Sequence, residues 1–374
     1  FPVHSFCATL YAHSICTPSY TVADATDCVA SAFGTLATGD TLIFSNDPTS
    51  NSPPPPLNSV VKEATWRLRG RHPTYLDCAN NFVHGVSIIL ERGVTLQAID
   101  ETFDDPLDML LRFENCENIT LLGYGATMKM DPAAYTRDES RHSLAFYDCA
   151  HCRVEGLVID GSGGDGVLVG TRTPVGFGRN MTFRNIRSFR HRRQGMTVTT
   201  CDGLVVEHCV FADTSGTPPL AGVDIEPNHD TARLTNINFR HTEFTRNDYA
   251  GLVMYMTKFN GGTTPISLSF EDIAVHDNWQ GTPPSTTSYA RVALQTSTAG
   301  GPTTGLRGTI DFTRAFLSDC SYGGFMTRKH HDMYKVNFTD LVVHRIGLKQ
   351  NGESHRAIKL LRYNYGGGGP GPGK

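Results

Sequence analysis

The chain has no long hydrophobic run and little net charge. No stretch of 18 apolar residues occurs among its 374 residues, so we expect no membrane-spanning helix. The formal net charge of −4 does not indicate a general polyanion-binding surface, so we expect no nucleic-acid partner. With 39% hydrophobic residues and 37 glycines, the composition is not that of a disordered chain either. The sequence therefore predicts an ordered β protein rich in turns.

Motifs for common metal, phosphate and redox sites are also missing. Asp165 ends a glycine-rich turn whose spacing matches neither an EF-hand nor a phosphate loop. It either extends an acidic site or hydrogen-bonds within its own turn. His330 and His331 have no third ligand at zinc spacing. The lone CxxC at residues 149–152 lacks a thioredoxin-like context, so we expect a structural use for it.

What the chain does contain is a repeated unit of a first strand, a turn and a second strand. Each first strand carries an apolar residue at one position, and these residues are 29, 23, 33, 31, 42 and 26 residues apart: Val154, Phe183, Val206, Phe239, Phe270, Phe312 and Phe338. The second strands, most of them opened by a small residue, lie at 166–169, 195–198, 222–226, 251–254, 324–327 and 357–360. Such units cannot bury an apolar face alone and must stack. The sequence predicts an all-β fold, a single-stranded parallel β-helix.

The two ends of the chain differ from these repeats. Residues 1–60 predict an N-terminal cap, because residues 24–33 have helical apolar spacing behind an Asp or Thr N-cap and a strand follows. Such a helix covers the unpaired strand edge of a solenoid. The proline-rich residues 52–56 predict a polyproline II segment or a loop. We expect the β-helix over residues 61–365, and a Gly/Pro-rich tail at 366–374 that orders only against a partner such as a neighbouring subunit.

One second strand carries two acids on the same side. Strand alternation puts Val223 and Ile225 inside, and Asp224 and Glu226 outside with Cα atoms about 6.6–7 Å apart. Coils stack about 4.8 Å apart, so side chains of neighbouring coils form columns beside the two acids. These columns contain Thr197 and Thr199 on one side, Val253 and Tyr255 on the other, and Gln295, Arg328 and Lys359 further along. We expect a polar strip centred on the two acids, with bases toward its C-terminal end.

Two glycan-cleaving chemistries suit this strip, and a solvated strand face is the alternative. A general acid and base about 6.5–9.5 Å apart suit inverting glycoside hydrolysis. The same two carboxylates are ligands for Ca²⁺, in which case Lys359 or Arg328 would assist proton abstraction from a uronate. The residues predicted to bind substrate are Tyr255, Arg193, Gln295, Asp165 and Thr199. Arg193 belongs to the basic cluster 189–194, which either contacts an acidic sugar or pairs with the two acids.

The cysteines and sequons indicate the compartment. Ten cysteines and three Asn-x-Thr sequons favour a secreted, oxidising environment, and if the protein is secreted we expect this sequence to be its mature form. The predicted glycosylation sites are Asn118, Asn180 and Asn337. Cys116, Cys149 and Cys201 each lie five residues before a first-strand apolar position. We expect them in one column, as a ladder of thiols or with a disulfide across neighbouring coils.

With these features the chain resembles the right-handed parallel β-helix proteins of the pectate-lyase-like superfamily. The resemblance covers roughly residues 20–362. It rests on the N-terminal helix with Gly39-Asp40-Thr41, on the coils, and on the stretch from Arg192 through Gly216-Thr217-Pro218-Pro219 to Pro227. Many secreted β-helix proteins that act on polysaccharides have similar stretches. The resemblance implies a right-handed coil and an extracellular polysaccharide as the partner.

The departures from individual families leave the reaction open. The chain lacks the Asn-Thr-Asp, Asp-Asp and Gly-His-Gly set of polygalacturonases, although Arg356-Ala357-Ile358-Lys359 is similar to their Arg-Ile-Lys strand. It also lacks the Asp-Pro-His motif of alginate epimerases. Asp224-Ile225-Glu226 resembles the calcium-binding acid pair of chondroitinase-B-like lyases, but Thr231 stands where their lysine is expected.

Two hypotheses from different classes follow. The first is an extracellular polysaccharide-cleaving enzyme, either a glycoside hydrolase or a polysaccharide lyase. Ca²⁺ would be a cofactor only if the enzyme is a lyase. The second is a non-catalytic structural glycoprotein of a cell wall or extracellular filament, since residues 52–56 resemble the serine-plus-four-prolines unit of plant and algal wall proteins. The tail at 366–374 would then serve self-assembly. A lectin-like use of the same strip is a third reading.

Overall fold

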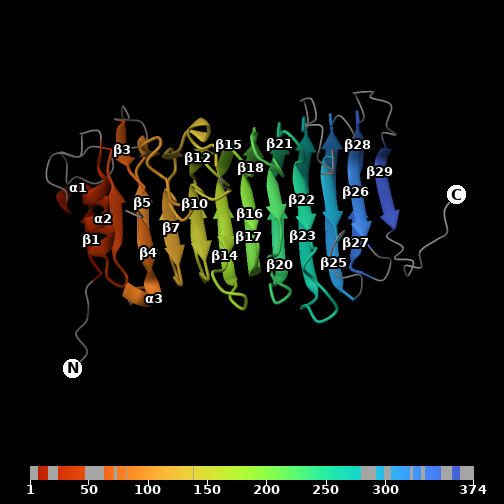
Figure 1. Ribbon diagram of the computed structural model, residues 1–374, viewed down its shortest axis with the longest axis horizontal. Helices are drawn as coiled ribbons and strands as arrows, with labels where there is room; N and C mark the ends of the chain where they lie inside the picture. Colours follow the sequence, from red (N-terminus) through yellow and green to blue (C-terminus); the bar gives the residue numbers. More distant parts are fainter. Residues whose placement is uncertain are drawn as a thin grey trace.

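The chain forms a row of stacked coils that runs from the N-terminal to the C-terminal end (Figure 1). The computed structural model describes residues 7–15, 24–46, 63–70, 74–81, 83–137, 139–278, 292–298, 305–320, 323–329, 333–346 and 356–362. Strands of consecutive coils pair in parallel throughout this part of the chain. The predicted all-β fold, a single-stranded parallel β-helix, is confirmed.

The strands form three faces. The first face contains β1 (Thr9–Tyr11), β2 (Thr41–Phe44), β5 (Ser87–Leu90), β8 (Thr120–Leu122), β11 (Arg153–Glu155), β14 (Gly178–Arg184), β17 (Cys201–Glu207), β20 (Leu234–Arg240), β23 (Ile266–His276), β25 (Gly308–Ser318) and β27 (Lys335–Thr339). The second face contains β3 (Ala64–Leu68), β6 (Val94–Ala98), β9 (Thr127–Lys129), β12 (Val158–Ser162), β15 (Arg187–His191), β18 (Val210–Ala212), β21 (Glu243–Thr245) and β28 (Val342–His344). Because β23 and β25 run through the bend between these faces, both belong to one 19-stranded sheet.

The third face is a separate 10-stranded sheet. It contains β4 (Tyr75–Asp77), β7 (Leu111–Glu114), β10 (Leu144–Tyr147), β13 (Val167–Gly170), β16 (Met196–Val198), β19 (Val223–Ile225), β22 (Leu252–Tyr255), β24 (Leu294–Ser297), β26 (Gly323–Lys329) and β29 (Arg356–Arg362). These strands include the predicted second strands of the repeat. The two predicted acids therefore lie on the third face.

The helices are short. They are α1 (Ala12–Ile15), α2 (Thr26–Gly34), α3 (Cys78–Asn81) and the 3₁₀ helix Pro132–Ala134, and no described helix is long and apolar enough to cross a membrane. The predicted N-terminal helix is present as α2, at the N-terminal end of the row (Figure 1). Its predicted Asp or Thr N-cap is wrong, because Ala25 is the N-cap and makes no side-chain capping bond. Its role as the cover of the first coil stays a prediction.

The predicted register is confirmed. The seven apolar first-strand positions pair with one another in order along the first face. The rings of Phe239, Phe270, Phe312 and Phe338 stack in succession, with centroids 5.3, 4.9 and 4.9 Å apart. The strand spacing of about 4.8 Å is also a favourable distance between aromatic rings, so an aromatic column continues from coil to coil.

The segment 206–211, which was interpreted as one straight first strand, is bent. The sequence analysis missed this bend. Val206 and Phe211 are both buried although they are five residues apart, an odd spacing that a straight strand places on opposite sides. His208 between them has a left-handed backbone with φ of 54°, and this residue turns the chain from β17 into β18. His241 has φ of 47° at the same place one coil later. The odd apolar spacing was the signal for this bend.

The cysteine column is confirmed, and one of its members forms a disulfide. Cys116 and Cys149 lie on adjacent coils, and Gly178 lies between Cys149 and Cys201. Cys116 is bonded to Cys78 of the preceding coil, with an S–S distance of 2.08 Å. Cys149 and Cys201 are buried thiols. Burial raises the pKa of both, which opposes formation of a reactive thiolate.

The predicted limits of the cap, the β-helix and the tail stay predictions. β2 already pairs with β5 in the 19-stranded sheet, so this part of the predicted cap shares the hydrogen bonding of the coils. Residues 52–56 and 366–374 lie outside the described residues.

Candidate functional site

The site is built around β19 on the third face. Val223 and Ile225 are fully buried in the core, and Asp224 lies between Thr197 of β16 and Val253 of β22. Glu226 follows the strand, and its backbone N–H donates to Val198 O at 3.1 Å. The predicted alternation therefore places both carboxyl groups outside the core and on one side of the strand.

The strand-face alternative required Asp224 to be a solvated side chain. The structure shows that it is not. It is only 1% exposed, whereas Glu226 is half-buried. Gln194 Nε2 donates to Asp224 Oδ2 at 3.0 Å, and the buried Oδ1 has no well-aligned hydrogen-bond partner among the described residues. A buried carboxyl group without full hydrogen bonding is costly, so this pair is unlike an ordinary surface pair of acids.

A third acid, Asp165, extends the same cluster. It is 1% exposed and lies in the turn before β13. Its Oδ2 accepts a hydrogen bond from Thr197 Oγ1 at 2.9 Å, and its backbone N–H donates to His142 Nδ1 at 3.0 Å. Of the two predicted roles of Asp165, the structure therefore favours the acidic site over bonding within its own turn.

Arg193 is the cation of this cluster. Its Nη2 lies 3.1 Å from Glu139 Oε2, its Nη1 lies 3.5 Å from Asp165 Oδ1, and its Nε donates to Pro218 O at 3.4 Å. The basic segment 189–194 thus supplies a base that pairs with acids, although with Asp165 and Glu139 rather than with Asp224 and Glu226. Gln194 is the member of the segment that bonds Asp224 directly.

The carboxyl groups of Asp224 and Glu226 influence each other's pKa and titrate as a pair. Burial raises the pKa of Asp224 well above its ordinary value, and the charge of Glu226 raises it further, while the bond from Gln194 and the charge of Arg193 oppose both effects. Burial also raises the pKa of Glu226, opposed by the charge of Arg193 and by hydrogen bonding to Asp224. Two interacting carboxyl groups share their protons, so the pair holds a proton at a pH where isolated acids have lost it.

His142 is neutral in this setting. It is buried, and burial lowers its pKa, against the attraction of Asp165 and with the repulsion of Arg193. Its Nδ1 accepts the backbone N–H of Asp165, which requires the unprotonated form of that nitrogen. Arg193 is therefore the cation that compensates Asp165.

The other predicted site residues lie along the same columns at different distances. Thr199 and Tyr255 flank Glu226 on the adjacent coils, and Gln295 lies beyond Val253 with only 2% exposure. Arg328 lies three coils from Glu226, through Tyr255 and Ser297, which is roughly 14 Å at the usual strand spacing. The backbone of Lys359 lies four coils from Asp224, or roughly 19 Å. Neither base is within hydrogen-bonding reach of the two acids.

The columns also continue toward the N-terminal end, which the sequence analysis missed. Arg112 lies in the column of Asp224, and its guanidinium carbon lies 4.5 Å from the ring centroid of Tyr75 and 5.4 Å from that of Tyr147. The guanidinium carbon of Arg172 also lies 5.4 Å from the Tyr147 centroid. Glu114 pairs with Arg112. Extending the alternation back to residues 111–114 and 144–147 would have found this group.

A separate cleft of about 900 Å³ has none of the acids Asp165, Asp224 and Glu226 in its lining. Arg192 and Thr217 line this cleft, and the backbone N–H of Thr217 donates to Arg192 O at 2.7 Å. The cleft also contains the buried Tyr135, whose hydroxyl has no partner among the described residues.

The three sequon asparagines are exposed. Asn118, just before β8, and Asn180, within β14, have left-handed backbones, with φ of 58° and 50°. Asn337 Nδ2 donates to Asp311 Oδ1 at 2.6 Å. Their exposure is compatible with glycosylation, which stays a prediction.

Comparison with known proteins supports the fold more than the chemistry. No family model matches the chain. The uncharacterized protein YclG of Bacillus subtilis is 28% identical over an alignment of 166 residues, and the match covers 39% of this chain. The chain therefore spans about a quarter of the length of this relative, 27%.

Among solved structures, a tailspike protein mutant of E. coli bacteriophage HK620 in complex with a pentasaccharide has a TM-score of 0.53 and 14% identity. The match covers 96% of this chain and 66% of that one. Endo-xylogalacturonan hydrolase from Aspergillus tubingensis has a TM-score of 0.52 and 11% identity, over 95% of this chain and 99% of that one. At these identities the likeness establishes the fold alone. The chain is therefore a right-handed parallel β-helix protein.

Proposed function

We propose that the protein is a secreted polysaccharide-cleaving enzyme in which Glu226 meets the substrate and Asp224 is its buried acid partner. The observation that carries this proposal is a buried carboxyl group, Asp224, beside the half-buried Glu226 on the third face, with an Asp224 oxygen that has no hydrogen-bond partner among the described residues. Burying a carboxyl group beside a second one is unfavourable for stability, and such arrangements are concentrated at catalytic sites. A face with a purely structural role gains no stability from a buried pair of carboxyl groups.

The pair supplies the proton for cleavage, because its raised pKa values keep a proton on it at a pH where isolated acids have lost theirs. Glu226 is half-buried and borders the surface, so it is the group that donates a proton to the glycosidic oxygen as the bond from that oxygen to the sugar carbon breaks. A water molecule adds to that carbon and returns its proton to the carboxyl pair. Asp224 is too buried to touch a polymer, so its part is to share the proton of Glu226 and keep the pKa of the pair high.

The columns beside Glu226 give the substrate its binding residues. Thr199 and Tyr255 lie one coil away on either side and suit contacts with the sugar ring at the cleaved bond. Arg328 and Lys359 are too far for this step, so we assign them to more distant sugar units, where cations favour an acidic polysaccharide.

A calcium-dependent lyase is the second candidate, and a set of buried oxygens favours it. Asp165 Oδ1, Gln194 Oε1 and Asp224 Oδ1 are buried and accept no hydrogen bond from the described residues. Carboxylate and amide oxygens are the ligands that calcium takes. Arg193 stands beside Asp165, so Asp224, Glu226 and Gln194 are the residues that would hold the ion. The bound ion would neutralise a uronate carboxylate.

Secretion and glycosylation belong to the same proposal. They are supported by the Cys78–Cys116 disulfide and by the exposure of the three sequons. The segments on which the wall or filament hypothesis rested, 52–56 and 366–374, lie outside the described residues, so that hypothesis gains no support.

The test is cleavage of a panel of acidic and neutral polysaccharides by the wild type and by Glu226→Gln and Asp224→Asn. Glu117→Gln, which changes an exposed acid outside the site, is the matched control. We expect the control to cleave normally and the two site variants to lose activity. New reducing ends without ultraviolet absorption indicate a hydrolase, whereas an unsaturated product that disappears with a chelator indicates a lyase. Unchanged cleavage by both site variants would remove these residues from the mechanism.

A further inference from the structure

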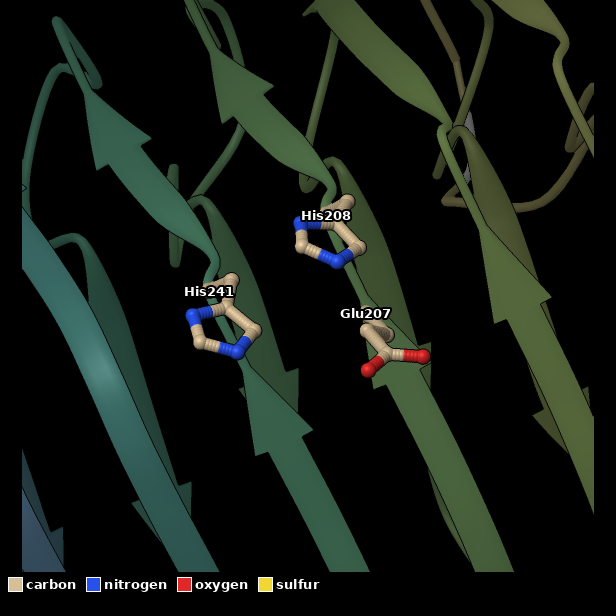
Figure 2. A group of neighbouring side chains, drawn as sticks. All are labelled: Glu207, His208 and His241. Atoms are coloured by element: carbon tan, nitrogen blue, oxygen red, sulfur yellow. The ribbon is translucent and has the colours of Figure 1, made fainter.

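A second cluster of side chains, at the bend between the first and second faces, suits a metal ion. It contains Glu207, the last residue of β17, and His208 and His241, which follow β17 and β20 (Figure 2). One possible ligand atom from each side chain lies within 4.8 Å of the other two. Among the described residues no other group of three His, Cys, Asp or Glu side chains meets this condition.

The backbone fixes the two imidazoles side by side. His208 and His241 occupy the same left-handed bend on consecutive coils. The backbone N–H of His208 donates to Arg240 O at 3.1 Å, and the backbone N–H of His241 donates to Glu271 O at 3.0 Å. Their side chains therefore leave the chain in parallel, and the rings stack with centroids 4.8 Å apart and planes 7° apart (Figure 2). Both side chains are exposed, so solvent ions reach them.

Neighbouring charges orient two of the three ligands. Arg184 Nε holds Glu207 Oε2 at 2.8 Å, which leaves Oε1 of the same carboxylate for a metal ion. Asp272 Oδ2 lies 3.6 Å from His241 Nδ1, and Arg314 fixes this aspartate through two hydrogen bonds of 2.6 and 2.8 Å. A carboxylate behind one ring nitrogen favours the tautomer whose other nitrogen binds metal.

We propose that Glu207, His208 and His241 bind a divalent transition-metal ion of the zinc type, which joins two consecutive coils. Two imidazoles and one carboxylate are a donor set that zinc accepts, and they leave a fourth position for water. Zinc–nitrogen bonds of about 2.0–2.1 Å allow two ring nitrogens to be at most about 4.2 Å apart. The two exposed rings therefore tilt toward each other on binding. Magnesium and calcium prefer oxygen ligands and do not suit this site.

The experiment measures zinc binding by the full-length chain, by calorimetry with zinc chloride and by the zinc-dependent rise in melting temperature. We expect one saturable site. Its signal is lost in His208→Ala and in His241→Ala, and its affinity falls about ten- to a hundredfold in Asp272→Asn, the usual effect of removing such a supporting carboxylate. Magnesium chloride produces no signal.

His151→Ala is the matched control. His151 is also exposed and left-handed, with φ of 55°, but it belongs to another bend, so its removal leaves zinc binding unchanged. Zinc binding that persists in the His208→Ala/His241→Ala double variant, or its absence from the wild type, would overturn the proposal. A melting temperature of the metal-free variants equal to that of the wild type verifies that they are folded. Because the readout is binding rather than cleavage, this result is independent of the catalytic proposal.

Discussion

The acid cluster of the third face buries its charged side chains, whereas the ion pairs of the bends leave theirs in contact with water. At the end of the second face, Arg246 Nε and Nη2 hold the two oxygens of Asp213 at 2.7 and 2.9 Å, where Arg246 is exposed and Asp213 is half-buried. On the third face Asp224 and Asp165 are buried, and among the described residues Arg193 is the guanidinium that pairs with Asp165. Water screens the first arrangement and is excluded from the second. The difference teaches that burial, and not the presence of charge, separates the proposed catalytic acids from the ordinary ion pairs of this solenoid.

The largest expected difference between the two regions is in cleavage. Glu226→Gln keeps the shape of the side chain but removes its transferable proton, so we expect the rate to fall about a hundred- to ten-thousandfold, the usual contribution of a general acid. Asp213→Asn, in the exposed pair, should leave the rate unchanged. The measurement is the initial rate of cleavage on the polysaccharide identified in the panel. Equal losses in both variants would erase the distinction between the regions.

The next effect is on stability. Arg193→Met leaves Asp165 buried without its cation, and we expect a loss of about 3–5 kcal/mol in the free energy of unfolding. The measurement is denaturant unfolding at neutral pH. Adding Asp165→Asn to the same chain removes the uncompensated charge, so the double variant should recover part of the loss. A single variant as stable as the wild type would mean that solvent reaches Asp165 freely.

A smaller effect is the pH dependence that Asp224 produces. Its folded-state pKa is raised, so the folded protein binds more protons than the unfolded chain above pH about 3.8, and stability falls as pH rises from there to the folded-state pKa. Asp224→Asn removes this contribution, of at most about 1.4 kcal/mol per pH unit. Unfolding curves across this range measure it. Parallel curves for the variant and the wild type would contradict the raised pKa.

The smallest effect belongs to the exposed pair. Arg246→Met should cost only about 0.2–1 kcal/mol, because water and salt screen the pair. Added salt should shrink even this difference, whereas it should hardly change the loss in Arg193→Met. A cost above about 2 kcal/mol at high salt would mean that the bends are as tightly coupled as the third face.

The sequence predicted the coils because their apolar positions recur with a fixed register. Val154, Phe183 and Val206 stack as their spacing indicated, and the column that contains Asp224 followed from the same register. The bend at His208 was missed because the segment was interpreted as one straight strand. As a result, His208 and His241, which are far apart in the sequence, were not recognised as neighbours in space.

The burial of Asp224 was beyond the sequence. Alternation determines on which side of a strand a residue lies, but not what covers that side. Here Gln194 reaches Asp224, and the neighbouring Arg193 contacts Pro218 in a non-repeating loop that has no periodic signal. Arg112 and Tyr147 were accessible to the same alternation argument, which had not been extended to their strands.

The place of β19 in the row has a consequence for local unfolding. Each coil contacts chiefly the coils beside it, so a solenoid melts inward from its ends like a one-dimensional chain of coupled units. On the third face β19 has five strands before it, from β4 to β16, and four after it, from β22 to β29. Unfolding that begins outside these strands must therefore pass through several intact coils before it reaches Asp224, and hydrogen exchange should be slower in the coils around β19 than in the outermost described coils.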